Sequence, residues 1–263
     1  MTSGKQAKSD RAARQAKIDA AAPKERKTKP ALVAAVVLVT LLALGAAVWF
    51  GNRSTAPDPA GTATGNSADH PQGATGPEGG IAISSANLKE GAPTLDVYED
   101  FQCPACQQIE QALGPTIKKM ADDGEIKVVY HTKTFLDANL RNDASTRAGN
   151  GAACAADAGA FGAYHDQVYA NPPANEGEGW TDAQLEEFAS AAGISGDKMT
   201  TWQQCFADRK YTPYLQRVEE ATARAGVTST PSFRVNGEKF DLQQQQIASA
   251  EDFRTKVLAA GGQ

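Results

Sequence analysis

Two cysteines three positions apart offer the clearest chemistry in this sequence. They lie in the stretch Phe101-Gln102-Cys103-Pro104-Ala105-Cys106. Residues 94–98, just before it, have the β-branched and aromatic content of a strand. Just after it, apolar residues recur at the three- and four-residue spacing of a helix, namely Ile109, Leu113, Ile117 and Met120. The two cysteines are therefore expected where a strand turns into a helix.

That placement predicts Pro104 at the first helical position and Cys103 at or beside the N-cap. The free backbone N–H groups and the positive end of the helix dipole stabilise a thiolate there. Cys106 follows on the same face, and helix geometry puts its Cα about 5 Å from that of Cys103, within the range of a disulfide. The pair predicts a redox site with one exposed, activated sulfur and a second sulfur behind it.

Two other interpretations of the cysteine pair remain open at this point. Half of a zinc site has the same spacing, and a purely structural disulfide is the other alternative. A zinc site would need further ligands, but Cys154 and Cys205 are isolated from each other in the sequence, and the histidines show no ligand spacing. The sequence therefore indicates no metal, nucleotide or organic cofactor.

The first 50 residues have the composition of a membrane anchor. Residues 1–29 carry nine Lys/Arg against three acidic residues, a net charge of +6, which predicts disorder. Residues 31–50 are 20 uncharged residues, and as a helix they would span about 30 Å, the thickness of a bilayer core. The basic side should be cytoplasmic. A cleaved signal peptide is the alternative, and it exports the rest of the chain equally.

We therefore expect a basic cytoplasmic tail over 1–30, a single-pass anchor in the cell membrane over 31–50, and a Gly/Pro/Ala-rich linker over 51–80. Residues 81–263 are long enough for one domain with a sizeable core, lying outside the cytoplasm. The whole chain carries −5 and the first 29 residues +6, so the remainder carries −11. This acidity argues against nucleic acid as a partner.

The order of predicted elements defines the fold class. A short edge strand at 81–83, the strand at 94–98, the cysteine helix over 104–121 and a strand at 125–130 predict a right-handed parallel βαβ unit. Helices follow at 141–158, 160–169, from Thr181 to 189, 197–208 and 213–225. Asn236-Gly237 then joins two strand-like runs, 232–235 and 238–240, which is a hairpin signal. With a last helix at 250–260, this is an α/β, thioredoxin-like fold with an inserted α-helical domain.

The chain resembles the DsbA-like family of exported, membrane-anchored thiol–disulfide oxidoreductases. The motif Phe-Gln-Cys-Pro-Ala-Cys, the helical insertion over about 137–225 and the loop 227–233 carry this resemblance. It implies Cys103 as the attacking thiol and Cys106 as the resolving one. It also implies a cis Pro231 facing the active-site sulfur, with Thr230 offering backbone groups to a substrate segment. Phe101 is a candidate substrate contact, and a core position fits it equally well.

The resemblance and the cysteine pair together predict an oxidase that introduces disulfides into unfolded exported proteins with free thiols. A membrane quinone-linked partner is expected to reoxidise it. There are two alternatives. One is a reductase or isomerase with the same fold, and the other is a non-enzymatic exported binding module with only structural disulfides. Relatives often have a histidine or aromatic residue where Ala105 stands, and strand alternation does not show whether Asp96, Glu99 or Asp100 reaches Cys106.

The remaining two cysteines predict a structural disulfide. Cys154 and Cys205 lie in separate predicted helices, and an exported domain with four cysteines, two of them paired for catalysis, favours pairing of the other two. Free buried thiols are the alternative, because unpaired cysteine is a common core residue.

Overall fold

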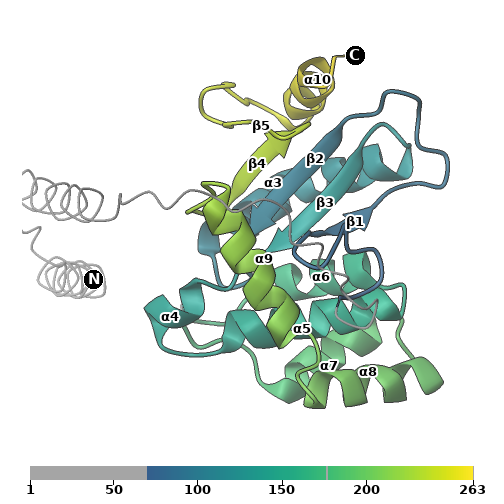
Figure 1. Ribbon diagram of the computed structural model, residues 1–263, viewed down its shortest axis with the longest axis vertical. Coiled ribbons are helices and arrows are strands. Elements are labelled where there is room, and N and C mark those ends of the chain that lie inside the picture. Colours follow the sequence, from purple (N-terminus) through teal and green to yellow (C-terminus); the bar gives the residue numbers. More distant parts are fainter. Residues whose placement is uncertain (1–69, 176, 263) are drawn as a thin grey trace, which may run out of the picture. The chain divides into compact units, whose positions relative to one another are not determined.

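The computed structural model describes residues 70–175 and 177–262, which form the domain drawn in colour in Figure 1. Within these ranges no helix is both long enough and apolar enough to cross a membrane. The tail expected over 1–30 and the anchor expected over 31–50 lie outside the described residues.

A five-stranded sheet in the order β1-β3-β2-β4-β5 forms the centre of the domain. The strands are β1 (Ile81–Ile83), β2 (Thr94–Glu99), β3 (Lys127–Thr132), β4 (Ser232–Val235) and β5 (Glu238–Lys239). β2 and β3 are parallel, with Val97 opposite Tyr130, and the other pairs are antiparallel. The parallel βαβ unit and the C-terminal hairpin are thus confirmed. β3 begins at Lys127 rather than Glu125, because the Glu125 amide still bonds Met120 O at the end of the preceding helix.

The helix after the cysteines, α3 (Pro104–Asp122), packs its apolar face against the sheet and against the last helix, α10 (Ala250–Ala260). Its buried positions follow the predicted spacing, and they include Cys106, Glu110, Leu113, Ile117 and Met120. In Figure 1 α3 lies behind the strands, while α9 (Thr212–Arg224) crosses in front of them. Both helices contact β3, the strand beside β2.

Between β3 and β4 the chain forms the inserted block, which lies at one end of the sheet (Figure 1). Its helices besides α9 are α4 (Leu136–Leu140), α5 (Ala144–Asp157), α6 (Phe161–Ala170), α7 (Asp182–Ala191) and α8 (Asp197–Ala207). Thr181 caps α7 with a full capping box, as its sequence indicates. The predicted helix over 141–158 was wrong at its start, because Arg141 adopts a left-handed conformation (φ 58°) that ends α4, and α5 begins three residues later.

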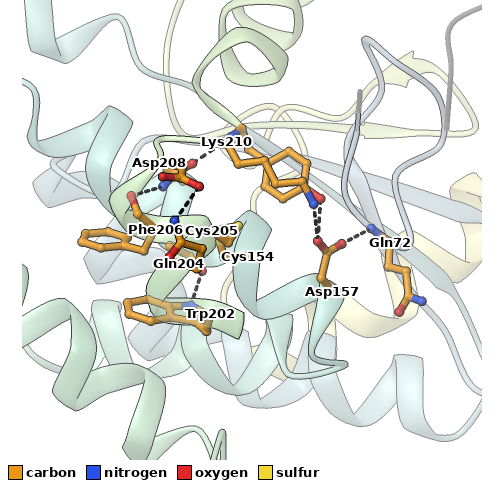
Figure 2. The surroundings of a disulfide bond; sticks show 12 residues. Gln72, Cys154, Asp157, Trp202, Gln204, Cys205, Phe206, Asp208 and Lys210 are labelled. Atoms are coloured by element: carbon orange, nitrogen blue, oxygen red, sulfur yellow. Dashed lines mark hydrogen bonds and ion pairs between the residues drawn. A yellow bond between two sulfur atoms is a disulfide. The ribbon is translucent and has the colours of Figure 1, made fainter. Parts of the chain in front are cut away.

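The disulfide predicted between Cys154 and Cys205 is present and joins α5 to α8. Trp202 and Phe206 stack beside it at 4.8 Å between ring centroids, and Trp202 Nε1 donates to Gly151 O at 2.9 Å (Figure 2). The bridge thus holds together two helices that also share an aromatic core.

The segment just before β1 lies along the inserted block. The backbone N–H of Gln72 donates to Asp157 Oδ1 on α5 at 3.0 Å (Figure 2). Further along, the Tyr214 hydroxyl of α9 donates to Gly79 O at 2.6 Å, and Arg224 pairs with Glu78 at 2.9 Å. Residues 72–79 therefore contact α5 and α9, although their composition is that of a linker.

Candidate active site

Cys103 is the N-cap residue of α3, and Pro104 occupies the first turn, as the sequence predicts. The Cys103 amide donates to Asp100 O at 2.9 Å, and the Cys103 carbonyl accepts from the Gln107 amide at 3.1 Å. These two bonds fix the turn from β2 into α3 and hold the sulfur over the free N–H groups of the helix. Cys103 is 8% exposed, less than expected for a nucleophile, and Cys106 is 1% exposed.

The cysteines are free thiols in this structure, and their acidities diverge. A hydrogen bond from the Cys106 thiol lowers the pKa of Cys103 from its ordinary 9.0 to about 5. Burial opposes this effect, while Thr230 and hydrogen bonds from the backbone of Cys106 and Ala105 support it. Burial, followed by the hydrogen bond to Cys103, raises the pKa of Cys106 far above its ordinary value. At neutral pH the pair is therefore a thiolate at Cys103 and a thiol at Cys106.

The Thr230–Pro231 peptide bond is cis, as expected, and the Cys103 Sγ lies 3.6 Å from Thr230 O. A groove of about 610 Å³ begins beside this loop. It is lined by Ala105 and Ile109 of α3, by the loop residues around Pro231, and by Phe240 and Leu242 beyond the hairpin. An extended segment lying in this groove would pass next to Cys103.

Phe101 belongs to the core. Its side chain is buried, with its ring centroid 5.8 Å from that of His165 and 5.1 Å from that of Tyr169. Its edge also lines a smaller hollow of about 140 Å³ that includes Cys103 and Trp180. Of the two interpretations of Phe101, the packing favours the structural one.

A buried polar network supports the turn from below. Ser145 Oγ donates to Asp100 Oδ1 at 2.5 Å, and the backbone N–H of Gln102 donates to the same oxygen at 2.9 Å. The Gln102 side-chain nitrogen lies within 2.9 Å of acceptors on Asp137, Asn142 and Ser145. Burial raises the pKa of Asp100 to about 7, against the hydrogen bond from Ser145. The inserted block thereby fixes the residues on either side of Phe101.

A second group behind the site comprises Glu99 at the end of β2, Glu110 on α3 and His165 on α6. All three side chains are buried, and one ligand-type atom of each lies within 4.8 Å of the others. This separation also suits a metal ion, but His165 Nε2 already hydrogen-bonds Glu99 Oε1 directly. Glu99 is one of the charges that act on Cys106, so it is the acid near the cysteines that strand alternation did not identify.

No sequence pattern predicts this cluster or the Asp100 network. Glu99 and Asp100 follow the strand directly and were recognised as nearby, but no spacing links them to Glu110 or His165. One signal was available: Glu110 lies four residues after Cys106, on the apolar face of α3, where an acid is unusual.

Comparison with known proteins agrees with this geometry. The family model described as thioredoxin matches residues 89–252. The reduced form of a disulfide bond oxidoreductase (DsbG) from Mycobacterium tuberculosis is 28% identical, with a TM-score of 0.59, covering 72% of this chain and 90% of that one. Reduced DsbA from Mycobacterium tuberculosis is also 28% identical, with a TM-score of 0.58, covering 70% of this chain and 93% of that one.

A curated relative, the Na(+)/H(+) antiporter NhaA 3 of Salinispora tropica, is 26% identical over 151 residues, 57% of this chain. The match spans only 21% of the antiporter's length. The chain therefore resembles one part of a much longer protein.

Proposed function

Because the chain belongs to the thioredoxin family and its described domain is a DsbA-like thiol–disulfide oxidoreductase, we propose that it works as an oxidase that introduces disulfides into exported proteins. The observation that carries this proposal is the position of Cys103 at the N-cap of α3, where the Cys106 thiol and the backbone of the first turn lower its pKa to about 5. A site that stabilises the thiolate stabilises the reduced enzyme, and a stabilised reduced form makes the corresponding disulfide a strong oxidant.

The reaction follows from the low pKa of Cys103 and the high pKa of Cys106. A substrate thiolate attacks the Cys103 sulfur of the Cys103–Cys106 disulfide, and the electron pair of the broken bond goes to Cys106. Cys106 takes up one proton, and the second substrate thiol gives up one proton as it ionises for the next step. A second substrate thiol then attacks the mixed disulfide, and Cys103 leaves as a thiolate that the helix N-terminus and the Cys106 thiol stabilise. A sulfur with a low pKa is a good leaving group, so release of the oxidised substrate is fast.

Substrate binding is assigned to the groove along the Thr230–Pro231 loop. Its backbone groups offer hydrogen bonds to an extended chain, and the apolar walls at Ile109, Phe240 and Leu242 suit unfolded segments. Such contacts are largely independent of substrate sequence, as an enzyme with many substrates requires.

The partners and the location of the enzyme are part of the proposal. The substrates are unfolded exported proteins with free thiols, and a membrane quinone-linked protein reoxidises the dithiol. The span at 31–50 anchors the chain in the cell membrane, with the N-terminus cytoplasmic and the catalytic domain on the other side.

The test is transfer of a disulfide from the oxidised protein to a reduced, unfolded protein, followed by the appearance of substrate activity. We expect stoichiometric transfer that Cys103→Ser abolishes, and a reduction potential nearer the about −120 mV of DsbA than the about −270 mV of thioredoxin. A potential near that of thioredoxin, with reduction of substrate disulfides in place of their formation, would assign the protein to the reductases.

A further inference from the structure

Cys103 lines the hollow of about 140 Å³ beside α3, on another side of the helix from the larger groove. Pro104 and Gln107 line the hollow, whereas Ala105 and Ile109 line the groove. At 3.6 residues per turn these two pairs lie about 150° apart around the helix axis. The nucleophile therefore lies between two depressions, and a substrate bonded to its sulfur can reach both.

Aromatic side chains form the walls of this hollow, which we call the Trp180 hollow. Phe101 and Tyr169 pack together, with ring centroids 5.1 Å apart. Trp180 is buried, and its Nε1 donates to Asn171 O at 2.6 Å, which fixes the indole against the loop after α6. The walls are thus held in place before anything binds, and a preformed site loses less conformational entropy on binding.

The size and chemistry of the Trp180 hollow select one kind of side chain. An apolar cavity of about 150 Å³ holds a benzene molecule. A hollow of about 140 Å³ therefore accepts one aromatic ring or one large aliphatic side chain. Val168, Pro172 and Pro173 add further apolar surface, and none of the described lining residues has a carboxylate, ammonium or guanidinium group. A charged side chain would lose its hydration there without gaining a partner.

The mixed disulfide with Cys103 determines which substrate residue reaches the hollow. In an extended segment, side chains two positions apart point to the same face, and their Cα atoms lie about 6.6–6.8 Å apart. When the substrate cysteine points at Cys103 Sγ, the residues two positions before and after it also point at the enzyme. One of them lies over the larger groove and the other over the Trp180 hollow, so the hollow continues the surface on which the substrate reacts.

We propose that the Trp180 hollow is a substrate subsite that binds an aromatic or large aliphatic side chain two positions from the attacking cysteine of an unfolded protein. The inference rests on the proposed function, because its occupant is part of the thiol substrate. It gives the enzyme a preference for cysteines with large apolar neighbours, which unfolded chains expose and folded proteins mostly bury. Cysteines among polar residues, as in surface loops, are then poor substrates.

The test measures how strongly the site holds a peptide that is bonded to Cys103. Full-length Cys106→Ala protein, carrying glutathione on Cys103, is mixed with a peptide that has a single cysteine. The peptide sulfur replaces glutathione on Cys103 and the peptide's thiol proton ends on the released glutathione, so one disulfide breaks and one forms. Mass spectrometry of the acid-quenched mixture gives the exchange constant. Dividing it by the constant for the same peptide with oxidised glutathione removes differences between the peptide thiols.

The peptides have glycine at every position except the cysteine and one residue two positions before or after it, which is Phe, Leu, Gly or Glu. At one of the two positions Phe should raise the corrected constant roughly tenfold or more over Gly, because a single methylene in an apolar pocket already has about this effect. Leu should lie between them, and Glu should not exceed Gly. Equal constants for all of these residues at both positions would overturn the proposal.

Gln107→Trp separates the Trp180 hollow from the larger groove. Gln107 is half-buried and lines the hollow alone of the two, so an indole at this position should fill it and remove the preference for Phe over Gly. Gln111→Trp is the matched control, because Gln111 is exposed one turn further along α3 and lines neither depression, and it should keep the preference.

A Phe preference that persists in Gln107→Trp would place the bound ring elsewhere and overturn the proposal. If circular dichroism shows that Gln107→Trp does not fold, Pro173→Phe fills the hollow from the loop side, with the same loss of preference expected. The proposed function fails separately. Absence of disulfide transfer to unfolded proteins, with the Phe preference present, would refute the oxidase and support the subsite, whereas transfer without any preference would refute the subsite alone.

Discussion

Lys133 Nζ lies 2.6 Å from Glu219 Oε1, and the lysine side chain is fully buried. Lys133 follows β3, and Glu219 belongs to α9. The same ammonium group donates to Thr222 Oγ1 at 2.6 Å and to Val227 O at 3.5 Å, at the start of the loop that carries Thr230 and Pro231. One buried cation therefore ties the sheet, α9 and the Thr230–Pro231 loop together.

Removing Glu219 should lower the free energy of unfolding much more than removing Lys133. Glu219→Ala leaves Lys133 charged and buried, so the free energy of unfolding should fall by about 3–5 kcal/mol. Lys133→Met should cost less, because Glu219 is 23% exposed and can be solvated. Urea unfolding of both variants checks this order. Lys119→Met breaks the exposed pair with Asp123 and serves as the control, with little or no change in the free energy of unfolding expected. Equal small losses in all three variants would contradict the role of Lys133.

The acidity of Cys103 should be visible in the reduced protein. Thiolate absorbance should rise in one step near pH 5, and Cys103→Ser should remove that step. Because the thiol of Cys106 is the main stabiliser of the thiolate, Cys106→Ala should keep the step but move it to higher pH. Disappearance of the step in Cys106→Ala would reverse the assignment of the two sulfurs.

The lowered pKa of Cys103 also predicts how the stability of the reduced protein depends on pH. The folded state holds Cys103 ionised from about pH 5 upward, whereas the unfolded chain ionises it only near 9.0. The stabilisation that the Cys103 thiolate gives the folded state is therefore fully present above pH 9, and it is lost as the pH falls through about 5. Between pH 5 and pH 7 it should grow by about 2 kcal/mol. The measurement is the free energy of unfolding of the wild type minus that of Cys103→Ser, both reduced, which cancels titration of Asp100 and Glu110. A difference that is independent of pH would argue against a low pKa.

The Cys154–Cys205 disulfide should stabilise the fold without taking part in exchange. It closes a loop with a sequence separation of 51, for which chain entropy predicts about 4 kcal/mol. Cys154→Ala/Cys205→Ala should therefore lower the melting temperature while Cys103 reacts with an alkylating reagent at the wild-type rate at lower temperature. Mass mapping of the oxidised wild type should give a Cys103–Cys106 peptide and a Cys154–Cys205 peptide. A crossed pairing would refute this division between catalysis and stability.

Most of the fold could be predicted because its signals are local. Pro104 after a strand, the Thr181 cap and Asn236-Gly237 each determine their surroundings within a few residues. The start of β3 and the break at Arg141 could not be predicted, since both depend on how the preceding helix ends.

In the candidate site, too, residues that belong to a local motif could be predicted, and residues that only long-range packing brings together could not. Cys103, Cys106 and Pro231 were accessible through motifs, whereas the cluster of Glu99, Glu110 and His165 exists only because α6 packs beside α3. In the sequence Lys133 is a charged residue after a strand, and only the position of α9 shows that it is buried. Long-range packing of polar groups leaves no periodic trace in a single sequence.

The contacts of residues 72–79 have a mechanical consequence. A pull on the chain from the side of residue 70 is resisted first by the bond of Gln72 to Asp157, and next by the bond that the Ala82 amide of β1 donates to Gly73 O at 2.8 Å. A pull therefore reaches α5 through Asp157 and the edge strand β1 through Ala82 before it reaches α9. Since α5 is covalently linked to α8, the force is carried into a cross-linked block. A load applied from this side is therefore divided between the cross-linked helices and the edge of the sheet that is farther from β4 and β5.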